Sequence, residues 1–204
     1  QVAYYSTKLQ TERLETLRFA KELRKDLNRP LAVCDPFCGV GPALSTLIAE
    51  EDLVERILAS DLNAAAVELL FENLQRWDKR EYPTESTPIE QYYDDRIVGQ
   101  ADATKLSGNS KYSGKWDLVL VNLPHRTIEF LPKIIPLLNR KNISLIRGRV
   151  IVAESDIKYA NEQINQILPP IASGKPKPQL KIKRDYSSTL RLCSFEAWID
   201  KEFN

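Results

Sequence analysis

The stretch Leu31-Ala32-Val33-Cys34-Asp35-Pro36-Phe37-Cys38-Gly39-Val40-Gly41-Pro42 decides the fold. Its first four residues are a short apolar run after the turn-forming Asn28-Arg29-Pro30, as expected of a strand buried on both faces of a parallel sheet. A glycine-containing loop follows and leads into a helix predicted over residues 42–51. An open α/β sheet binds its ligand at such a place, outside the carboxyl ends of its strands. The stretch therefore predicts a ligand loop in an α/β sheet.

Strands and helices alternate along the rest of the chain. Apolar residues at helical spacing predict helices over 11–27, 64–77 and 156–168, and short apolar runs predict strands over 56–60, 96–99, 116–121 and 149–153. This alternation implies βαβ units and a mainly parallel sheet. Two further β segments, Leu180–Lys183 and Leu190–Ile199, suit an antiparallel pair at the edge. We expect a Rossmann-like α/β fold: a mainly parallel seven-stranded sheet, helices on both faces and an antiparallel C-terminal strand.

The connections between these elements are polar or contain proline. Residues 78–95 read as a surface excursion, Pro132 and Pro136 are expected to break or bend one helix, and residues 169–178 read as a linker. A chain of 204 residues fits one α/β domain with a full core. We expect a single catalytic domain over residues 1–204, with a short helical lead-in over residues 1–30.

Charge and cysteine content narrow the class of protein. The 29 Lys and Arg nearly balance the 28 Asp and Glu, so the overall field does not steer the protein toward a polyanion. No apolar stretch resembles a signal peptide or a membrane span, and Cys34, Cys38 and Cys193 are an odd number in mostly apolar contexts. A reduced cytoplasmic protein without membrane contact is expected. No metal is expected, because Cys34 and Cys38 lack a second ligand pair and His125 is the only histidine.

Three carboxylates at predicted strand ends indicate which ligand the loop binds. Gly39 and Gly41 let the backbone approach a ligand, and Asp35 suits the ammonium group of a methionine moiety but would repel a pyrophosphate. Asp61 is placed to accept both hydroxyl protons of a ribose, and Asp102 to contact an adenine amino group. The alternative is a plain glycine turn with helix-capping acids. The pattern favours S-adenosyl-L-methionine, with Phe37, Leu62, Ala103 and Asn122 completing the expected cofactor site.

A second loop, Asn122-Leu123-Pro124-His125, follows another buried strand. Asn122 offers a carbonyl acceptor and an amide donor to a base or amine, and Pro124 stiffens the loop. An asparagine at such a turn can also be a simple backbone cap. For the single loop histidine, His125, incidental exposure is the simplest interpretation.

Four segments together resemble one family. They are Tyr5-Ser6-Thr7-Lys8-Leu9-Gln10-Thr11-Glu12-Arg13, the loop Asp35–Pro42, Asn122–His125 with Glu129-Phe130-Leu131, and Tyr186-Ser187-Ser188. In that order, these segments resemble the catalytic domain of the Trm5/TYW2 family. The similarity is greatest to its tRNA (guanine-N1)-methyltransferase branch. The resemblance implies that Glu12 is the general base and that Asn122 holds the target guanine, with tRNA as the partner.

The chemistry of guanine agrees with these implied roles. N1 of neutral guanine carries a proton, which a base must remove before N1 can attack a methyl group. Taken without the resemblance, Glu12 reads as an acid near a helix N-terminus that the helix dipole stabilises. Lys8 stands where the family often has arginine, and the family's additional N-terminal domains, which grip the tRNA, have no counterpart in the sequence.

Other functions remain open at this point. The chain could transfer the aminocarboxypropyl group of the same cofactor, or be a non-catalytic or partner-dependent cofactor-binding subunit. An enzyme that methylates amino groups would normally carry an aromatic residue where His125 stands. Two basic clusters could contact RNA phosphates: Arg140, Lys141, Arg147 and Arg149 in one, and Lys175, Lys177, Lys181, Lys183 and Arg184 in the other.

Overall fold

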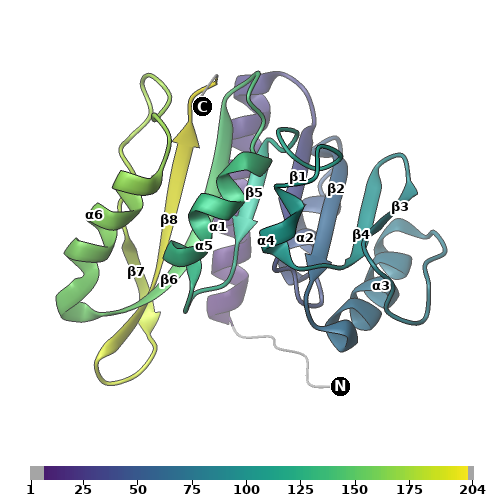
Figure 1. Cartoon of the computed structure of the whole chain (residues 1–204), viewed down its shortest axis with the longest axis horizontal. Helices are drawn as coiled ribbons and strands as arrows, with labels where there is room; N and C mark the ends of the chain where they lie inside the picture. The colour runs from purple at the N-terminus through teal and green to yellow at the C-terminus, as the bar shows by residue number, and fades with distance from the viewer. Residues whose placement is uncertain (1–6, 202–204) are drawn as a thin grey trace.

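The computed structural model describes residues 7–201, with side chains from residue 11 onward. Over this range eight strands form one sheet in the order β3-β4-β2-β1-β5-β6-β8-β7 (Figure 1). The strands are β1 (Leu31–Asp35), β2 (Val54–Asp61), β3 (Glu90–Tyr93), β4 (Arg96–Gln100), β5 (Leu118–Val121), β6 (Ser144–Ala153), β7 (Lys181–Asp185) and β8 (Leu190–Ile199). The helices are α1 (Thr7–Leu27), α2 (Pro42–Ile48), α3 (Ala64–Asp78), α4 (Ala103–Leu106), α5 (Thr127–Ile134) and α6 (Ile157–Ile167), with 3-10 turns η1 (Ile135–Leu137) and η2 (Glu154–Asp156).

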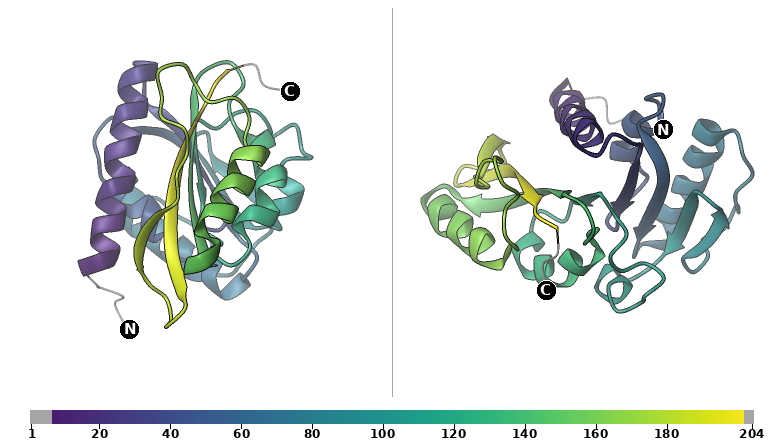
Figure 2. Two further views of the ribbon diagram at one scale, coloured as in Figure 1. Left: turned by 90° about the vertical axis from the view of Figure 1, so that its left-hand side faces the viewer. Right: turned by 90° about the horizontal axis from the view of Figure 1, so that it is seen from above.

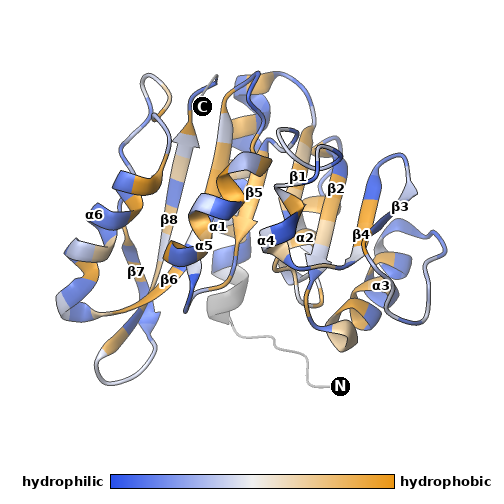
Figure 3. Ribbon diagram, in the orientation of Figure 1, coloured by the Kyte–Doolittle hydropathy of each residue, from blue (hydrophilic) through white to orange (hydrophobic). Residues whose placement is uncertain are grey.

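The five strands β4, β2, β1, β5 and β6 run parallel and form the centre of the sheet. All five residues of β1 and all four of β5 are buried, as strands covered on both faces must be. Figure 3 shows the central strands, β5 for example, in the colours of apolar residues. The expected Rossmann-like α/β fold is confirmed.

Two separate apolar clusters lie on the two faces of the sheet. On one face α1, α2 and α3 pack through residues such as Leu23, Leu44 and Phe71. On the other face α4, α5 and α6 pack through residues such as Leu106, Leu131 and Ile164. Figure 2 shows these two layers of helices with the sheet between them. Helix α1 therefore belongs to the hydrophobic core of the sheet.

The expected number of seven strands is wrong because the excursion at residues 78–95 contains the edge strand β3. This strand pairs antiparallel with β4, and the backbone before it also bonds to β4, since the N–H of Gln100 donates to the carbonyl of Thr87 at 2.7 Å. Tyr82 and Tyr92 pack their rings against Phe71 of α3. The excursion is thus held by aromatic packing that its polar sequence does not reveal.

Strand β6 begins at Ser144, five residues before the expected strand. The polar stretch Arg147-Gly148-Arg149 interrupts the apolar pattern, yet it pairs with Phe195 and its neighbours on β8 along a continuous antiparallel ladder. Arg147 is accommodated because it forms an ion pair with Glu196 across the ladder. Strand β5 begins two residues later than expected, since Trp116 forms only an isolated bridge with Leu138.

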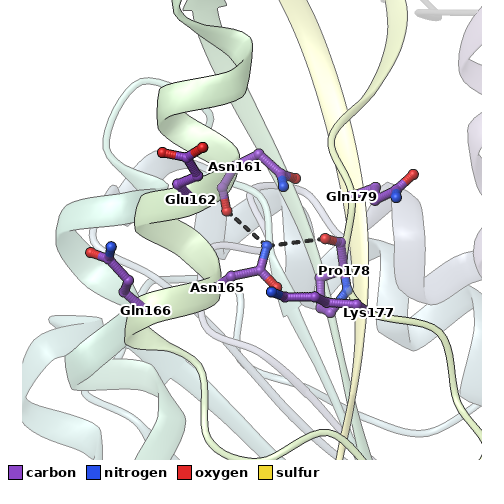
Figure 4. A pocket seen from close by; sticks show the side chains of 7 residues that line it. All are labelled: Asn161, Glu162, Asn165, Gln166, Lys177, Pro178 and Gln179. Carbon is purple, nitrogen blue, oxygen red and sulfur yellow. Dashed lines mark hydrogen bonds between the residues drawn. The ribbon is translucent and has the colours of Figure 1, made fainter.

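The segment expected to be a linker, residues 169–178, is packed against the protein. The Lys175 ammonium lies 2.8 Å from Glu22 and 2.7 Å from Asp26 of α1, and 3.8 Å from the ring centroid of Trp198. Figure 4 shows how the same segment meets α6: the amide of Asn165 donates to the carbonyl of Pro178 at 3.1 Å. The linker thereby fixes the start of the β7–β8 hairpin, whose outer strand β7 is almost entirely exposed.

Candidate functional site

The carboxyl ends of the parallel strands β1, β2, β4 and β5 bring the predicted site residues to one edge of the sheet. Asp35 is the last residue of β1, Asp61 is the last residue of β2, and Asn122 follows β5 directly. In Figure 1 the arrowhead of β5 points toward the lower edge, where the N-terminal end of α1 also lies. Segments far apart in sequence thus converge where an open α/β sheet binds ligands.

The loop between β1 and α2 is shaped by its two glycines. Gly39 and Gly41 both have positive φ, 54° and 81° respectively, which glycine adopts without strain. A Cβ on Gly41 would lie 2.8 Å from Cδ1 of Leu70 and 3.2 Å from the ring of Trp77, whereas a Cβ on Gly39 would meet nothing within 4 Å. Gly41 is therefore required for packing against α3, and open space lies beside Gly39.

Hydrogen bonds hold this loop against the next strand. The N–H of Cys38 donates to the carbonyl of Ser60 at 3.0 Å, and the N–H of Gly39 donates to Asp61 Oδ2 at 2.8 Å. The other oxygen of Asp61 accepts the N–H of Asn63 at 2.9 Å. Asp61 thus orders the glycine loop, and it also lines a cavity that is described below.

Asp102 has the local role that the plain-turn alternative assigns to it. It is the N-cap of α4, and its Oδ1 accepts the N–H of Thr104 at 2.9 Å and the Thr104 hydroxyl at 2.7 Å. These bonds lower the pKa of Asp102. The same carboxylate also lines the cavity described next, so capping and ligand contact are compatible.

A cavity of about 430 Å³ lies at this edge of the sheet. Six of the residues expected around a cofactor line it: Phe37, Asp61, Leu62, Asp102, Ala103 and Asn122. The remaining lining residues are Pro36, Ala101, Thr104, Leu123, Arg126, Glu129, Phe130 and Lys133. The rings of Phe37 and Phe130 meet edge to face at 5.8 Å and form an apolar wall. Volume and lining suit a small polar ligand with an aromatic part.

Asp35 does not line this cavity but lies buried beside the loop, with 2% of its surface exposed. Burial, together with the nearby charge of Asp61, raises the pKa of Asp35 to about 7, while the Phe37 N–H and Arg149 act in the opposite direction. A carboxylate in such a position gains most from a cationic ligand, because the cation compensates for the lost hydration. Gly39, Gly41, Glu12 and Pro124 also lie outside the cavity lining.

The Asn122–His125 loop is fixed to β6. The carbonyl of Pro124 accepts the N–H of Ile151 at 2.9 Å, and the Thr127 hydroxyl lies 2.9 Å from the carbonyl of Leu123 and 2.6 Å from that of Arg149. Nε2 of His125 lies 3.2 Å from the Tyr186 hydroxyl. The loop is therefore preorganised by contacts on both of its sides.

Glu12 is buried at the N-terminal end of α1 among three cations. Its Oε2 lies 3.2 Å from Nη2 of Arg149 and 4.0 Å from Nη2 of Arg147, and its Oε1 lies 3.9 Å from Nζ of Lys183. Oε2 has no hydrogen-bond partner among the described residues, although it belongs to these ion pairs. Arg149 also places Nη1 3.5 Å from Oδ1 of Asn122. One guanidinium thus connects the two side chains expected to act on the substrate.

Most members of the two basic clusters form ion pairs within the protein, and their contact with phosphate stays a prediction. Arg147 pairs with Glu15 and Glu196, Lys183 with Glu15 and Lys181 with Glu196. Lys175 pairs with acids of α1 and Arg149 with Glu12, as described above. Arg140 and Lys141 precede the amino end of β6, away from the site, and Lys177 and Arg184 are exposed.

The remaining predictions concern the first motif, a metal site, the cysteines and a membrane span. Tyr5 and Ser6 of the first motif lie outside the described residues, as does the side chain of Lys8. Within residues 7–201, no group of His, Cys, Asp and Glu side chains could hold a metal ion. Cys34, Cys38 and Cys193 are free and buried. No helix in the described range is long and apolar enough to cross a membrane.

Several solved structures superpose on this Rossmann-like α/β fold. TYW2 from M. jannaschii in complex with AdoMet superposes with a TM-score of 0.65 at 18% identity, over 98% of this chain and 79% of that chain. The M. jannaschii tRNA m1G37 methyltransferase gives 0.65 at 20% identity, over 98% of this chain and 52% of that one. The complex of aTrm5 with tRNALeu gives 0.65 at 18% identity, over 97% and 48%.

This chain therefore spans about half the length of the M. jannaschii tRNA m1G37 methyltransferase and of aTrm5. No protein-family model matches the sequence. No curated protein matches it either.

Proposed function

We propose that this chain binds S-adenosyl-L-methionine and transfers its methyl group to N1 of a guanine in tRNA, acting as a single catalytic domain. The observation that carries the proposal is the cavity at the carboxyl ends of the strands, lined by Phe37, Asp61, Leu62, Asp102, Ala103 and Asn122. The structures with the same fold include a TYW2 complex with AdoMet and a Trm5 complex with tRNA. The buried free cysteines of this chain suit a reducing compartment, and we propose that this compartment is the cytoplasm.

The residues present fit the cofactor by their chemistry. A buried carboxylate at Asp35 suits the ammonium group, and the space beside Gly39 allows close approach of a ligand to the backbone. Asp61 offers acceptors to ribose hydroxyls, and Asp102 offers one to an adenine amino group. Phe37 and Phe130 supply an apolar surface for the adenine ring.

The proposed reaction divides the work between two side chains. The bound cofactor supplies a methyl group that its positive sulfur already activates. Glu12 would accept the proton from N1 of guanine, which would free the N1 electron pair to attack that methyl group, and the cofactor would leave as a neutral thioether. Asn122 holds the base through its amide, and Pro124 keeps the loop in position through its bond to Ile151. No metal is needed in this scheme.

The proposal is tested by transfer of labelled methyl from S-adenosyl-L-methionine to unmodified tRNA transcripts with G or A at position 37. We expect transfer to the G transcript only, and its loss in Glu12→Gln with cofactor binding retained. Binding measured by calorimetry separates the two steps. Tight cofactor binding without transfer to any transcript would reject tRNA as the substrate, and absence of cofactor binding would reject the whole proposal.

A further inference from the structure

Arg149 occupies a position between the two proposed catalytic side chains that the proposed function does not explain. It lies on β6, one residue beyond the Val121↔Gly148 pair that ends the register with β5, and its side chain is 22% exposed. Its guanidinium approaches Glu12 with one nitrogen and Asn122 with the other. Glu12 and Asn122 are 110 positions apart in sequence, and this one side chain contacts both.

The contact with Arg149 decides which way the Asn122 amide faces. A guanidinium has only donors, so the amide oxygen of Asn122 must be the atom that faces it. The amide NH2 then points away from Arg149. Because Asn122 also lines the cavity, this orientation leaves the site with a hydrogen-bond donor at that position.

Glu12 supplies the complementary group. An ionised carboxylate only accepts hydrogen bonds, and the cations Arg149, Lys183 and Arg147 lie within 4.0 Å of Glu12. Its Oε2 still lacks a hydrogen-bond donor among the described residues. This oxygen can therefore accept an N–H group from a ligand.

A donor from Asn122 and an acceptor from Glu12, both in contact with Arg149, match the groups on one edge of one purine. Guanine carries the acceptor O6 next to the donor N1–H. Adenine carries an amino donor and an unprotonated N1 at the same places, so both contacts would be mispaired. Leaving buried polar groups unpaired is the strongest way in which a binding site rejects an analogue.

We propose that Arg149 is a positioning residue that sets the base selectivity of this site: it orients Asn122 as a donor and holds Glu12 as an acceptor, so that the site takes the O6/N1–H edge of guanine. This inference rests on the proposed function, since the base must bind between these side chains. Arg149 itself need not touch the base.

The first experiment measures selectivity in Arg149→Lys, which keeps the charge but cannot direct two separate nitrogens at Glu12 and Asn122. We expect the unmodified protein to methylate transcripts with guanosine or inosine at the target position, since inosine keeps the same edge, and not those with adenosine. In Arg149→Lys we expect kcat with guanosine to fall and the guanosine-to-adenosine ratio to drop about tenfold or more. Cofactor affinity should change less than about threefold, because the positive charge near Asp35 remains.

The matched control is Arg76→Lys on α3, an exposed arginine that pairs with Glu72 at 3.4 Å. It should leave both rate and selectivity unchanged. An Arg149→Lys protein with unaltered rate and guanosine-to-adenosine ratio would overturn the inference.

A second experiment decides whether Arg149 holds Glu12 without relying on methyl transfer. The unfolding midpoints of Glu12→Gln, Arg149→Met and the double variant form a cycle. We expect Arg149→Met alone to be the least stable and the double variant to recover part of the loss, because Glu12 is then no longer left as a buried carboxylate without its nearest cation. Additive effects would refute the coupling. If the unmodified protein methylates no transcript, the proposed function fails, while this cycle still decides the coupling of Arg149 with Glu12.

Discussion

The buried carboxyl of Asp35 makes cofactor binding dependent on pH. Only its ionised form pairs with the ammonium group of the cofactor, and burial raises the pKa of Asp35 to about 7. With that pKa, the ionised fraction falls from about 0.76 at pH 7.5 to about 0.03 at pH 5.5. The dissociation constant for S-adenosyl-L-methionine should therefore rise roughly 25-fold over this range, or about 1.9 kcal/mol.

The groups that face Asp35 do not cancel this dependence. Asp61 and Arg149 are the charged side chains that act on it, from β2 and β6. The neighbouring thiols of Cys34 and Cys38 have pKa values raised well above their ordinary value by burial, so they stay neutral throughout the range. The titration between pH 5.5 and 7.5 should therefore belong to Asp35.

Isothermal titration calorimetry with S-adenosyl-L-methionine at several pH values measures this effect directly. Asp35→Asn should bind more weakly at pH 7.5 and lose the pH dependence. The matched control is Asp102→Asn: the pKa of Asp102 is lowered by its bonds to Thr104, so this variant should weaken binding yet keep the full slope. A slope that persists in Asp35→Asn, or is absent from the unmodified protein, would refute the assignment of the ammonium group to Asp35.

Three further predictions concern stability. The folded-state pKa of Asp35 lies above its ordinary value of 3.8. The contribution of Asp35 to the stability of the ligand-free protein is therefore complete below about pH 4 and is lost as the pH rises through about 7. Asp35→Asn should raise the melting temperature at pH 7.5 but not at pH 4. In Gly148→Ala the new Cβ would overlap the ring of buried Phe195, so denaturant unfolding should show a loss of about 2 kcal/mol, whereas Gly108→Ala, whose Cβ would meet only the Lys105 carbonyl at 3.7 Å, should change stability little. Asp117→Ala removes a fully buried carboxylate that accepts hydrogen bonds from the Arg29 guanidinium, the Ala32 N–H and the Asn139 amide. Chemical denaturation should show that the free energy of unfolding falls by about 3 kcal/mol, and a fall below about 1 kcal/mol would contradict this account.

Much of the fold could be predicted because the central strands are apolar and short. Leu31–Cys34 is bounded by turn residues on both sides, and buried parallel strands leave such a signature. Strand β3 could not be found in this way, because Glu90-Gln91-Tyr92-Tyr93 is polar and lies at an edge. Its place depends on packing against Phe71, which is a tertiary contact.

The candidate site could likewise be predicted from the sequence only in part. Asp35, Asp61 and Asn122 follow predicted strands directly, so parallel topology alone brings them to one edge of the sheet. The side chain of Arg149 was given a role only in a basic cluster, although its backbone was predicted to begin a strand. Its ion pair with Glu12 joins residues 137 positions apart, and local sequence contains no signal for such a contact. The charges that look like a phosphate-binding surface are mostly internal partners for acids, because sequence does not show which charges are paired.

The exposed outer strand β7 has a consequence for how copies of this protein meet. An open sheet ends in a row of unpaired backbone groups that can recruit another chain. In β7 the exposed side chains of Lys181 and Arg184 add positive charge along that row. Two copies that approached edge to edge through β7 would bring these cations together, so the strand discourages end-to-end polymerisation of the sheet. Replacing its exposed basic residues with threonine would preserve the strand and remove its protection against fibrillar assembly.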